Sequence, residues 1–128
     1  MKYIKLILSL SIIFTSNAFS ETFLCVGDEG AEVTNIGQSI QSKLITAERL
    51  KLILSNESGE WSLKYHGGIP TGLDRCINGS LCERSDDSFG GLFLKDNLNV
   101  FTFHTLRVDP KNQSNVTDIL IKGLCTKL

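Results

Sequence analysis

The four cysteines of this chain constrain its fold more than any other feature. They are Cys25, Cys76, Cys82 and Cys125, and the outer two stand near the ends of the sequence that follows an N-terminal leader. In an oxidising compartment an even number of cysteines indicates disulfides, and four cysteines allow three pairings. We therefore expect a small domain whose two ends are tied together by sulfur.

The favoured pairing joins Cys25 to Cys125 and Cys76 to Cys82, while the other two pairings stay open. The segment between the inner cysteines contains Asn78-Gly79, and Asn-Gly is a dipeptide that forms tight hairpin turns. Such a turn would bring the two inner sulfur atoms face to face. The long bridge would stabilise the fold by about 4.7 kcal/mol if loop entropy governs, so its loss should cost more than that of the short bridge.

Two other uses of the cysteines are a zinc site completed by His66 and His104, and a redox pair. Zinc ligands usually come in close pairs two to four residues apart, and a thioredoxin-like pair has two intervening residues. Five residues separate Cys76 from Cys82. The spacing favours structural disulfides over both alternatives, and we expect neither a metal nor a cofactor.

The leader, residues 1–20, has the three parts of a secretory signal peptide. Lys2 and Lys5 open it, an apolar run follows over residues 6–14, and Ala18-Phe19-Ser20 places small residues at the −3 and −1 positions of a cleavage site. The apolar run falls short of the ~20 residues that a membrane span needs. We expect cleavage after Ser20, a bacterial origin, and residues 21–128 as one domain in the periplasm or outside the cell, with no membrane anchor.

The charge of the mature chain argues against nucleic acid as a partner. The whole sequence has 13 basic and 14 acidic residues, for a formal charge of −1, and loss of Lys2 and Lys5 with the leader makes it −3. A nucleic-acid-binding domain needs a basic patch to neutralise phosphates. The mature chain offers none in its sequence.

Alternating apolar residues and turn signals predict an all-β fold. Leu50 to Leu54 and Trp61 to Tyr65 alternate on either side of Asn56–Gly59, as in a hairpin with one buried face. Further strands are expected at Phe89–Leu94, Leu98–Val108 (the longest) and Val116–Lys122, with a loop at Asp109–Asn115. The pattern predicts a small antiparallel β-barrel or meander of seven to eight strands; a β-sandwich is the alternative.

The segment Gly27–Ala47 is the hardest to interpret. Four of its apolar residues fit one helical face, so we expect a short helix or a covering loop. In the strand Leu98–Val108, Phe101 and Phe103 face one way while Val100, Thr102, His104, Leu106 and Val108 face the other. Both faces are therefore apolar. Either Gly27–Ala47 covers the second face, or that face is a pocket or a partner surface.

No motif for catalysis is present: the chain has no nucleophile elbow, no His-Glu-x-x-His and no phosphate-binding glycine loop. The binding candidates are aromatic residues and histidines. They are Trp61, Tyr65, His66, Phe101, Phe103 and His104. Trp61 and Tyr65 could stack on a ligand but equally fill a core. His104 lies on an apolar face, and the sequence shows no catalytic partner for it, which favours a structural role.

The ends of the chain resemble those of small periplasmic β domains that begin aromatic-x-Cys, here Phe23-Leu24-Cys25, and end Gly-x-Cys, here Gly123-Leu124-Cys125. C-type lysozyme inhibitors are similar in size, early cysteine and barrel fold, although their inhibitory loops match no positions here. We expect a protein-binding or inhibitor-like module acting through a loop such as Gly67–Asp74. The alternatives are a carrier of a small apolar ligand and, least favoured, a hydrolase using His66 or His104.

Overall fold

The described residues fold into nine β-strands joined by turns and short loops. The computed structural model describes residues 19–86 and 90–128, so most of the expected leader and the start of the expected strand Phe89–Leu94 lie outside the described residues. The strands are β1 (Thr22–Ile36), β2 (Ser39–Thr46), β3 (Lys51–Ser55), β4 (Ser62–Tyr65), β5 (Arg75–Ile77), β6 (Leu81–Glu83), β7 (Gly91–Lys95), β8 (Val100–Asp109) and β9 (Asn112–Lys127). Over these ranges no helix is long and apolar enough to cross a membrane.

Eight of the strands form one antiparallel, nearly closed barrel. Their order is β4-β3-β1-β9-β8-β7-β6-β5, and β4 and β5, at the two ends of this order, contact each other. The ninth strand, β2, pairs only with β1 and lies outside the barrel path. The expected all-β class and small antiparallel barrel are therefore confirmed, and the alternative sandwich of two sheets is not observed.

Both hairpins that turn chemistry predicted are present. β3 pairs with β4, and β5 pairs with β6 with Cys76 directly opposite Cys82. The Ser80 N–H donates to Ile77 O at 3.0 Å and closes a β-turn in the second hairpin. Its two central residues, Asn78 and Gly79, have φ angles of 52° and 66°, the positive values that a type I′ turn needs and that Asn-Gly adopts readily. The short disulfide follows directly from this register.

The barrel interior is filled by phenylalanine and leucine side chains. The rings of Phe93 and Phe101 stack with their centroids 5.7 Å apart, and both residues have no exposed area. Gly27 and Gly123 stand opposite each other on β1 and β9. A Cβ on Gly123 would lie 2.7 Å from the ring of Phe101, so the absence of a side chain makes room for that ring. No polar or charged residue of the described chain is buried.

The long disulfide joins the first and last strands. Cys25 and Cys125 face each other in the β1–β9 register, with their Cα atoms 3.9 Å apart and a sequence separation of 100. The favoured pairing of all four cysteines is thereby confirmed. The bridge fixes the strand pair on which the rest of the sheet is built.

The segment Gly27–Ala47 is neither a helix nor a covering loop, so that expectation was wrong. It forms the second half of β1 and all of β2, joined by the tight turn at Gly37. A β-bulge at Asp28, between Gly27 and Glu29, interrupts the alternation along β1. The residues that fit a helical face, Ile36, Ile40, Leu44 and Ala47, lie beyond this bulge at intervals of four, four and three residues. A spacing of four also keeps two residues on one face of a strand, as for Ile40 and Leu44 on β2.

The strands near the C-terminus are longer than expected. β9 begins at Asn112, and the expected loop Asp109–Asn115 shrinks to a turn at Pro110-Lys111. The Asp109 carboxylate accepts a hydrogen bond from the Lys111 backbone N–H at 2.9 Å, as aspartate does in tight turns. β9, not the strand containing Phe101, is therefore the longest of the described strands.

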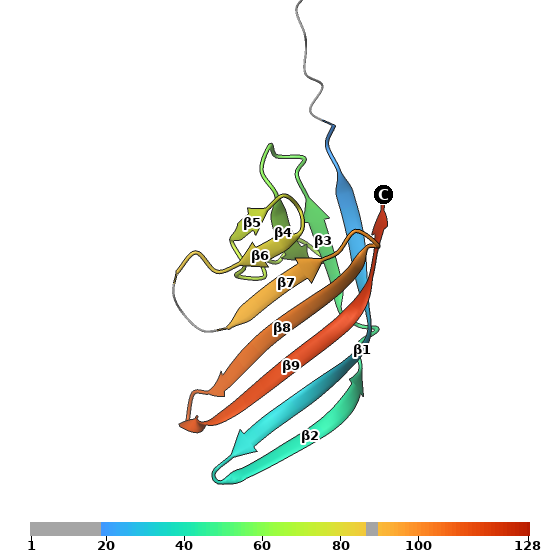
Figure 1. Ribbon diagram of the computed structural model, residues 1–128. Coiled ribbons are helices and arrows are strands. Elements are labelled where there is room, and N and C mark those ends of the chain that lie inside the picture. The colour runs from blue at the N-terminus through green and yellow to red at the C-terminus, as the bar shows by residue number, and fades with distance from the viewer. Residues whose placement is uncertain (1–18, 87–89) are drawn as a thin grey trace, which may run out of the picture.

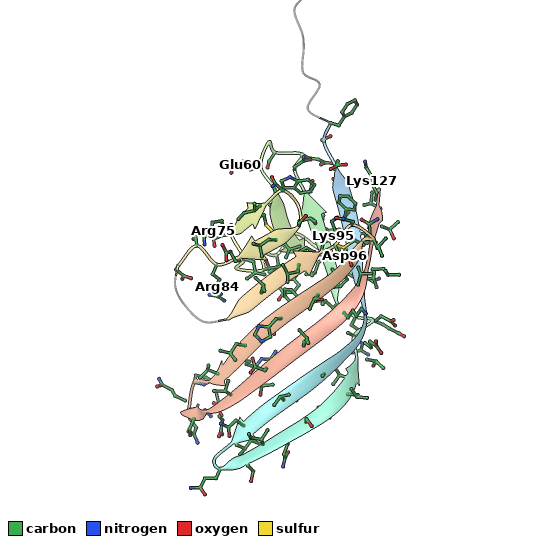
Figure 2. All side chains as sticks on the ribbon, viewed as in Figure 1. Glu60, Arg75, Arg84, Lys95, Asp96 and Lys127 are labelled. Carbon is green, nitrogen blue, oxygen red and sulfur yellow. A yellow bond between two sulfur atoms is a disulfide. The ribbon has the colours of Figure 1, made fainter. Side chains whose placement is uncertain are left out.

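Four strands continue beyond the barrel as an open sheet. This extension consists of β2, the second half of β1, the first half of β9 and the second half of β8 (Figure 1). Charged side chains on the surface of the barrel include Glu60, Arg75, Lys95 and Lys127 (Figure 2). Because the extension is an open sheet, neither of its faces lies inside the barrel.

Candidate functional site

The two faces of the extension differ from those of the barrel. The face that continues the barrel interior becomes mostly polar beyond Ile121. In the next row Ile119 still packs against the core, but its neighbours include Glu32 and Lys43, which form an ion pair of 3.5 Å, and the row after that contains Thr34 and Thr117. The opposite face, which points to solvent, carries most of the apolar side chains. The sheet thus turns its apolar side outward once it leaves the barrel.

The outward side chains align in rows because directly opposed residues of antiparallel strands share a face. One row runs Leu44, Ala31, Leu120 and His104 across β2, β1, β9 and β8. The next two rows add Val33 and Leu106 beside the polar Ser42 and Asp118, and then Ile40, Val116 and Val108 beside Asn35. We call the resulting apolar surface the outer strip; it comprises Ala31, Val33, Ile40, Leu44, Leu106, Val108, Val116 and Leu120.

Much of the outer strip is open to solvent. Leu44 is 89% exposed, Ile40 76% and Leu120 49%. A run of apolar side chains this exposed, spanning four strands, is unusual for a monomeric soluble domain and typically marks a contact surface.

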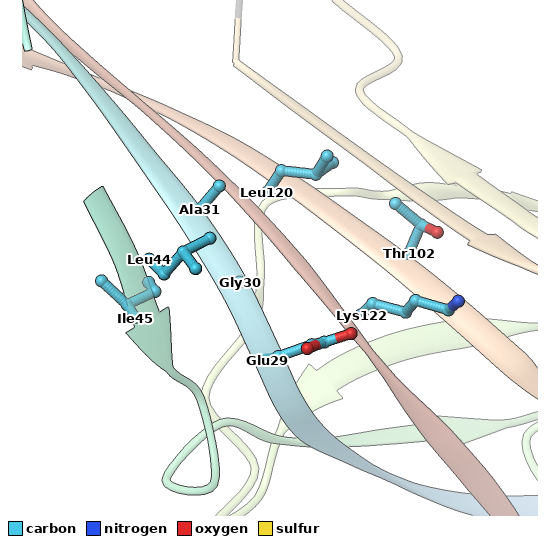
Figure 3. A pocket seen from close by; sticks show the side chains of 8 residues that line it. All are labelled: Glu29, Gly30, Ala31, Leu44, Ile45, Thr102, Leu120 and Lys122. Atoms are coloured by element: carbon cyan, nitrogen blue, oxygen red, sulfur yellow. The ribbon is translucent and has the colours of Figure 1, made fainter. Parts of the chain in front are cut away.

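A shallow hollow indents the outer strip. Ala31 is small and stands between Leu44 and Leu120, so the sheet surface dips there, and a volume of about 340 Å³ opens above it (Figure 3). Glu29, Lys122 and Thr102 border the hollow on the barrel side. The hollow is wide enough for one large apolar side chain, with polar groups along one rim.

The polar centre of the outer strip is a histidine–aspartate pair. His104 on β8 and Asp118 on β9 lie 2.9 Å apart, Nε2 to Oδ1, and their side chains are 41% and 49% exposed. Among the described residues no hydroxyl or thiol bonds to the histidine. The pair therefore resembles two members of a catalytic triad without the nucleophile that hydrolysis requires.

Three of the aromatic candidates pack in the barrel, while Trp61 also lines an open hollow of about 460 Å³ beside the short disulfide hairpin. Phe101 and Phe103 are buried, and Tyr65 meets Phe103 edge to face at 6.4 Å. Trp61 lies 6.4 Å from Phe23 and covers the Asn78-Gly79 turn, where a Cβ on Gly79 would come within 2.8 Å of the indole. These rings close one end of the barrel and join the short disulfide hairpin to it.

The structure separates the residues of the alternative zinc site. All four cysteines are in disulfides, so none is a thiolate ligand. His66 is exposed in the turn after β4, where its backbone N–H donates to Lys51 O, while His104 is on the outer face of β8. Neither histidine is joined to a cysteine pair.

The loop Gly67–Asp74 is fixed at its C-terminal half. Leu73 is 3% exposed and inserts into the core, and the Thr71 hydroxyl donates to Leu63 O at 2.9 Å. The Ser85 hydroxyl and backbone N–H both donate to the Asp74 carboxylate and hold the pKa of this group below its usual 3.8. In the other half of the loop Ile69 is a large apolar side chain that is 65% exposed.

Sequence reasoning found only the β8 part of the outer strip. It placed Leu106 and Val108 with His104 on one apolar face, but it did not find Leu120 beside them or Leu44 at the edge, because both assignments need the strand register. The alternation of Leu120 with Lys122 was the available signal. Comparison of the chain with protein-family models, curated proteins and solved structures finds no match.

Proposed function

We propose that this chain is an exported protein-binding module and that the outer strip is its contact surface. The partner that fits is a folded protein presenting a large apolar side chain to the hollow above Ala31. The observation that supports this proposal most directly is that, in the extension, the face of the sheet in contact with water carries most of the apolar side chains. Burial of apolar area contributes roughly 25 cal/mol per Å², which makes such a face favourable to cover.

Two disulfides in a chain with a signal-like leader support the export. Disulfides persist in the periplasm and outside the cell and are rare in reducing compartments. Both bridges are formed within the chain. This supports a protein that meets its partner in an oxidising space, either the periplasm or the surroundings of the cell.

Packing of the barrel makes a ligand carrier the weaker proposal. A carrier site typically encloses most of its ligand in a cavity lined by apolar groups. Here Phe93, Phe101 and Phe103 occupy the barrel axis, and the hollow above Ala31 lies on an open sheet face. A flat apolar surface with one indentation suits a protein partner better than a small molecule.

The proposal is tested by partner capture with matched variants. The purified protein is immobilised and exposed to an envelope fraction of the source cells, beside the variants Leu120→Asp and Leu98→Asp. Leu98 is 80% exposed but lies in the turn before β8, away from the outer strip, so its variant is the control. We expect one protein in stoichiometric amount with the native chain and the control, and its loss with Leu120→Asp.

Purified partner then gives the affinity directly by calorimetry. The Ala31→Leu variant fills the hollow without adding charge, and we expect it to weaken binding roughly tenfold or more, which corresponds to at least ~1.4 kcal/mol. Equal retention by the native protein and both aspartate variants would place the contact elsewhere. Absence of any retained protein would argue against the proposed function.

A further inference from the structure

We propose that the free edge of β2 pairs with the same edge of a second copy of this chain, giving a symmetric dimer with one continuous sheet. The inference concerns the strand edge and does not depend on the partner proposed for the outer strip. Among the described strands β2 pairs with β1 alone. Its other side therefore presents eight residues of strand without a neighbour.

The direction of the unpaired backbone groups follows from one hydrogen bond. The Ala47 N–H donates to Asp28 O at 3.1 Å, so it points toward β1. Backbone groups alternate in direction along a strand, and therefore the N–H and C=O groups of Ile40, Ser42 and Leu44 point away from β1. These groups form a regular ladder open on one side.

The β2 edge lacks the features that normally prevent such pairing. Edge strands are usually short, or carry proline, a bulge or charged side chains. β2 has eight residues, no proline and no bulge, and its one charged residue, Lys43, is engaged by Glu32 of the same chain on the inner face. By contrast, the free edge of β8 beyond Thr105 is short and ends in Asp109-Pro110.

One antiparallel register suits a second copy best. In this register Ser42 lies opposite Ser42 of the other copy. Leu44 then faces Ile40 of the other copy, and Ile40 faces the other copy's Leu44. These are two of the most exposed large apolar side chains of the chain, at 89% and 76%. In the same register Lys43 faces Gln41 and no like charges meet. About six backbone hydrogen bonds form, two for each of three hydrogen-bonded pairs.

Edge pairing of two copies is isologous, because an antiparallel strand pair maps onto itself under a two-fold rotation. The dimer joins the outer strips of both copies edge to edge. A heterologous strand added by a different protein would use the same backbone groups but would leave the purified chain monomeric. The mass of the purified protein therefore distinguishes the two occupants.

The first experiment measures this mass by sedimentation and light scattering across a dilution series. We expect twice the chain mass with a concentration-dependent return to monomer. Ser42→Pro removes an outward donor while leaving the hydrogen bonds to β1, and Leu44→Lys removes an apolar pair; each should raise the dimer dissociation constant roughly tenfold or more. A chain that stays monomeric at every concentration would overturn the proposal.

A charge-exchange variant tests the register itself. Ile40→Glu and Leu44→Lys each weaken the dimer alone, whereas the double variant should regain it, because the proposed register sets each new carboxylate opposite a new ammonium of the other copy. Within one chain the two positions lie too far apart along the strand to pair with each other, at roughly 13 Å for four residues. Failure of the double variant to recover would contradict this register.

Thiol cross-linking supplies a readout that does not depend on affinity. All native cysteines are in disulfides, so Ser42→Cys introduces the one free thiol. A short bismaleimide should join two such copies, since opposed residues in a hydrogen-bonded pair lie about 5.5 Å apart. Thr46→Cys, on the same face but roughly 27 Å from its counterpart, should not cross-link. Equal cross-linking of both variants would indicate random collision and would refute the paired edge.

Discussion

At the scale of single residues, the absence of two side chains determines how closely the barrel walls approach. Gly27 and Gly123 oppose each other where β1 crosses the phenylalanine core. A Cβ on Gly123 would lie 2.0 Å from Val26 O and 2.7 Å from the ring of Phe101, and neither group is a flexible chain end. The strand pair and the ring can approach only because this position is glycine.

We predict that Gly123→Ala destabilises the protein by about 1–3 kcal/mol or more, the usual cost of overpacking a tight core. The urea midpoint of unfolding should fall while its slope stays constant, as expected when the native state alone is affected. Thr126→Ala, an exposed position three residues further along β9, is the control and should change stability by less than ~0.5 kcal/mol. A similar midpoint for both variants would mean that the walls can move apart at no cost.

At the scale of whole elements, the bulge in β1 decides which side chains face outward. Before it Cys25 points into the barrel; after it the extra residue, Asp28, reverses the alternation, so that Ala31 and Val33 face solvent. Without the bulge, both of these residues would point to the inner face, since a shift of one residue exchanges the two faces of a strand. The outward position of Ala31 and Val33 thus requires that Asp28 is accommodated as a bulge.

This also explains which elements could be predicted from the sequence. The β3–β4 hairpin and the Cys76–Cys82 hairpin are specified by neighbouring residues, so alternation and Asn-Gly turn chemistry were sufficient. The Gly27–Ala47 segment was not predictable for two reasons. The alternation along β1 shifts at a bulge that only pairing with β9 reveals, and the four-residue spacing of Ile36, Ile40 and Leu44 is also typical of a helix. The outer strip depends in the same way on register between strands far apart in sequence.

Deletion of Asp28 should leave both the extension and the barrel folded. Gly27↔Gly123 and Glu29↔Lys122 would become successive pairs of a regular ladder, so that Ala31 and Val33 keep their outward side. We expect hydrogen exchange of the β2 amides to stay close to that of the native protein, except at Ala47, whose N–H loses the Asp28 carbonyl as its acceptor. Asp28→Ala retains both the bulge and this carbonyl and is the control. Loss of protection along the whole of β2 in the deletion variant would show that the extension requires the bulge itself.

At the scale of the whole molecule, the long disulfide ties together the two strands that connect the barrel and the extension. β1 and β9 pair along almost their whole length, and Cys25 and Cys125 cross-link them at the barrel end. The short bridge, between Cys76 and Cys82, closes only a hairpin at the end of the strand order. The two disulfides therefore restrict very different amounts of the unfolded chain.

Loop entropy gives their relative contributions: about 4.7 kcal/mol for a loop of 100 residues and about 2.2 kcal/mol for one of six. We predict that the pair of substitutions Cys25→Ser and Cys125→Ser lowers the free energy of unfolding by roughly 2.5 kcal/mol more than Cys76→Ser with Cys82→Ser. Urea unfolding at low temperature measures both, because the first variant has little stability to spare on warming. Equal losses would show that the short bridge acts through the native hairpin, by holding the turn beneath Trp61, and not through the unfolded chain.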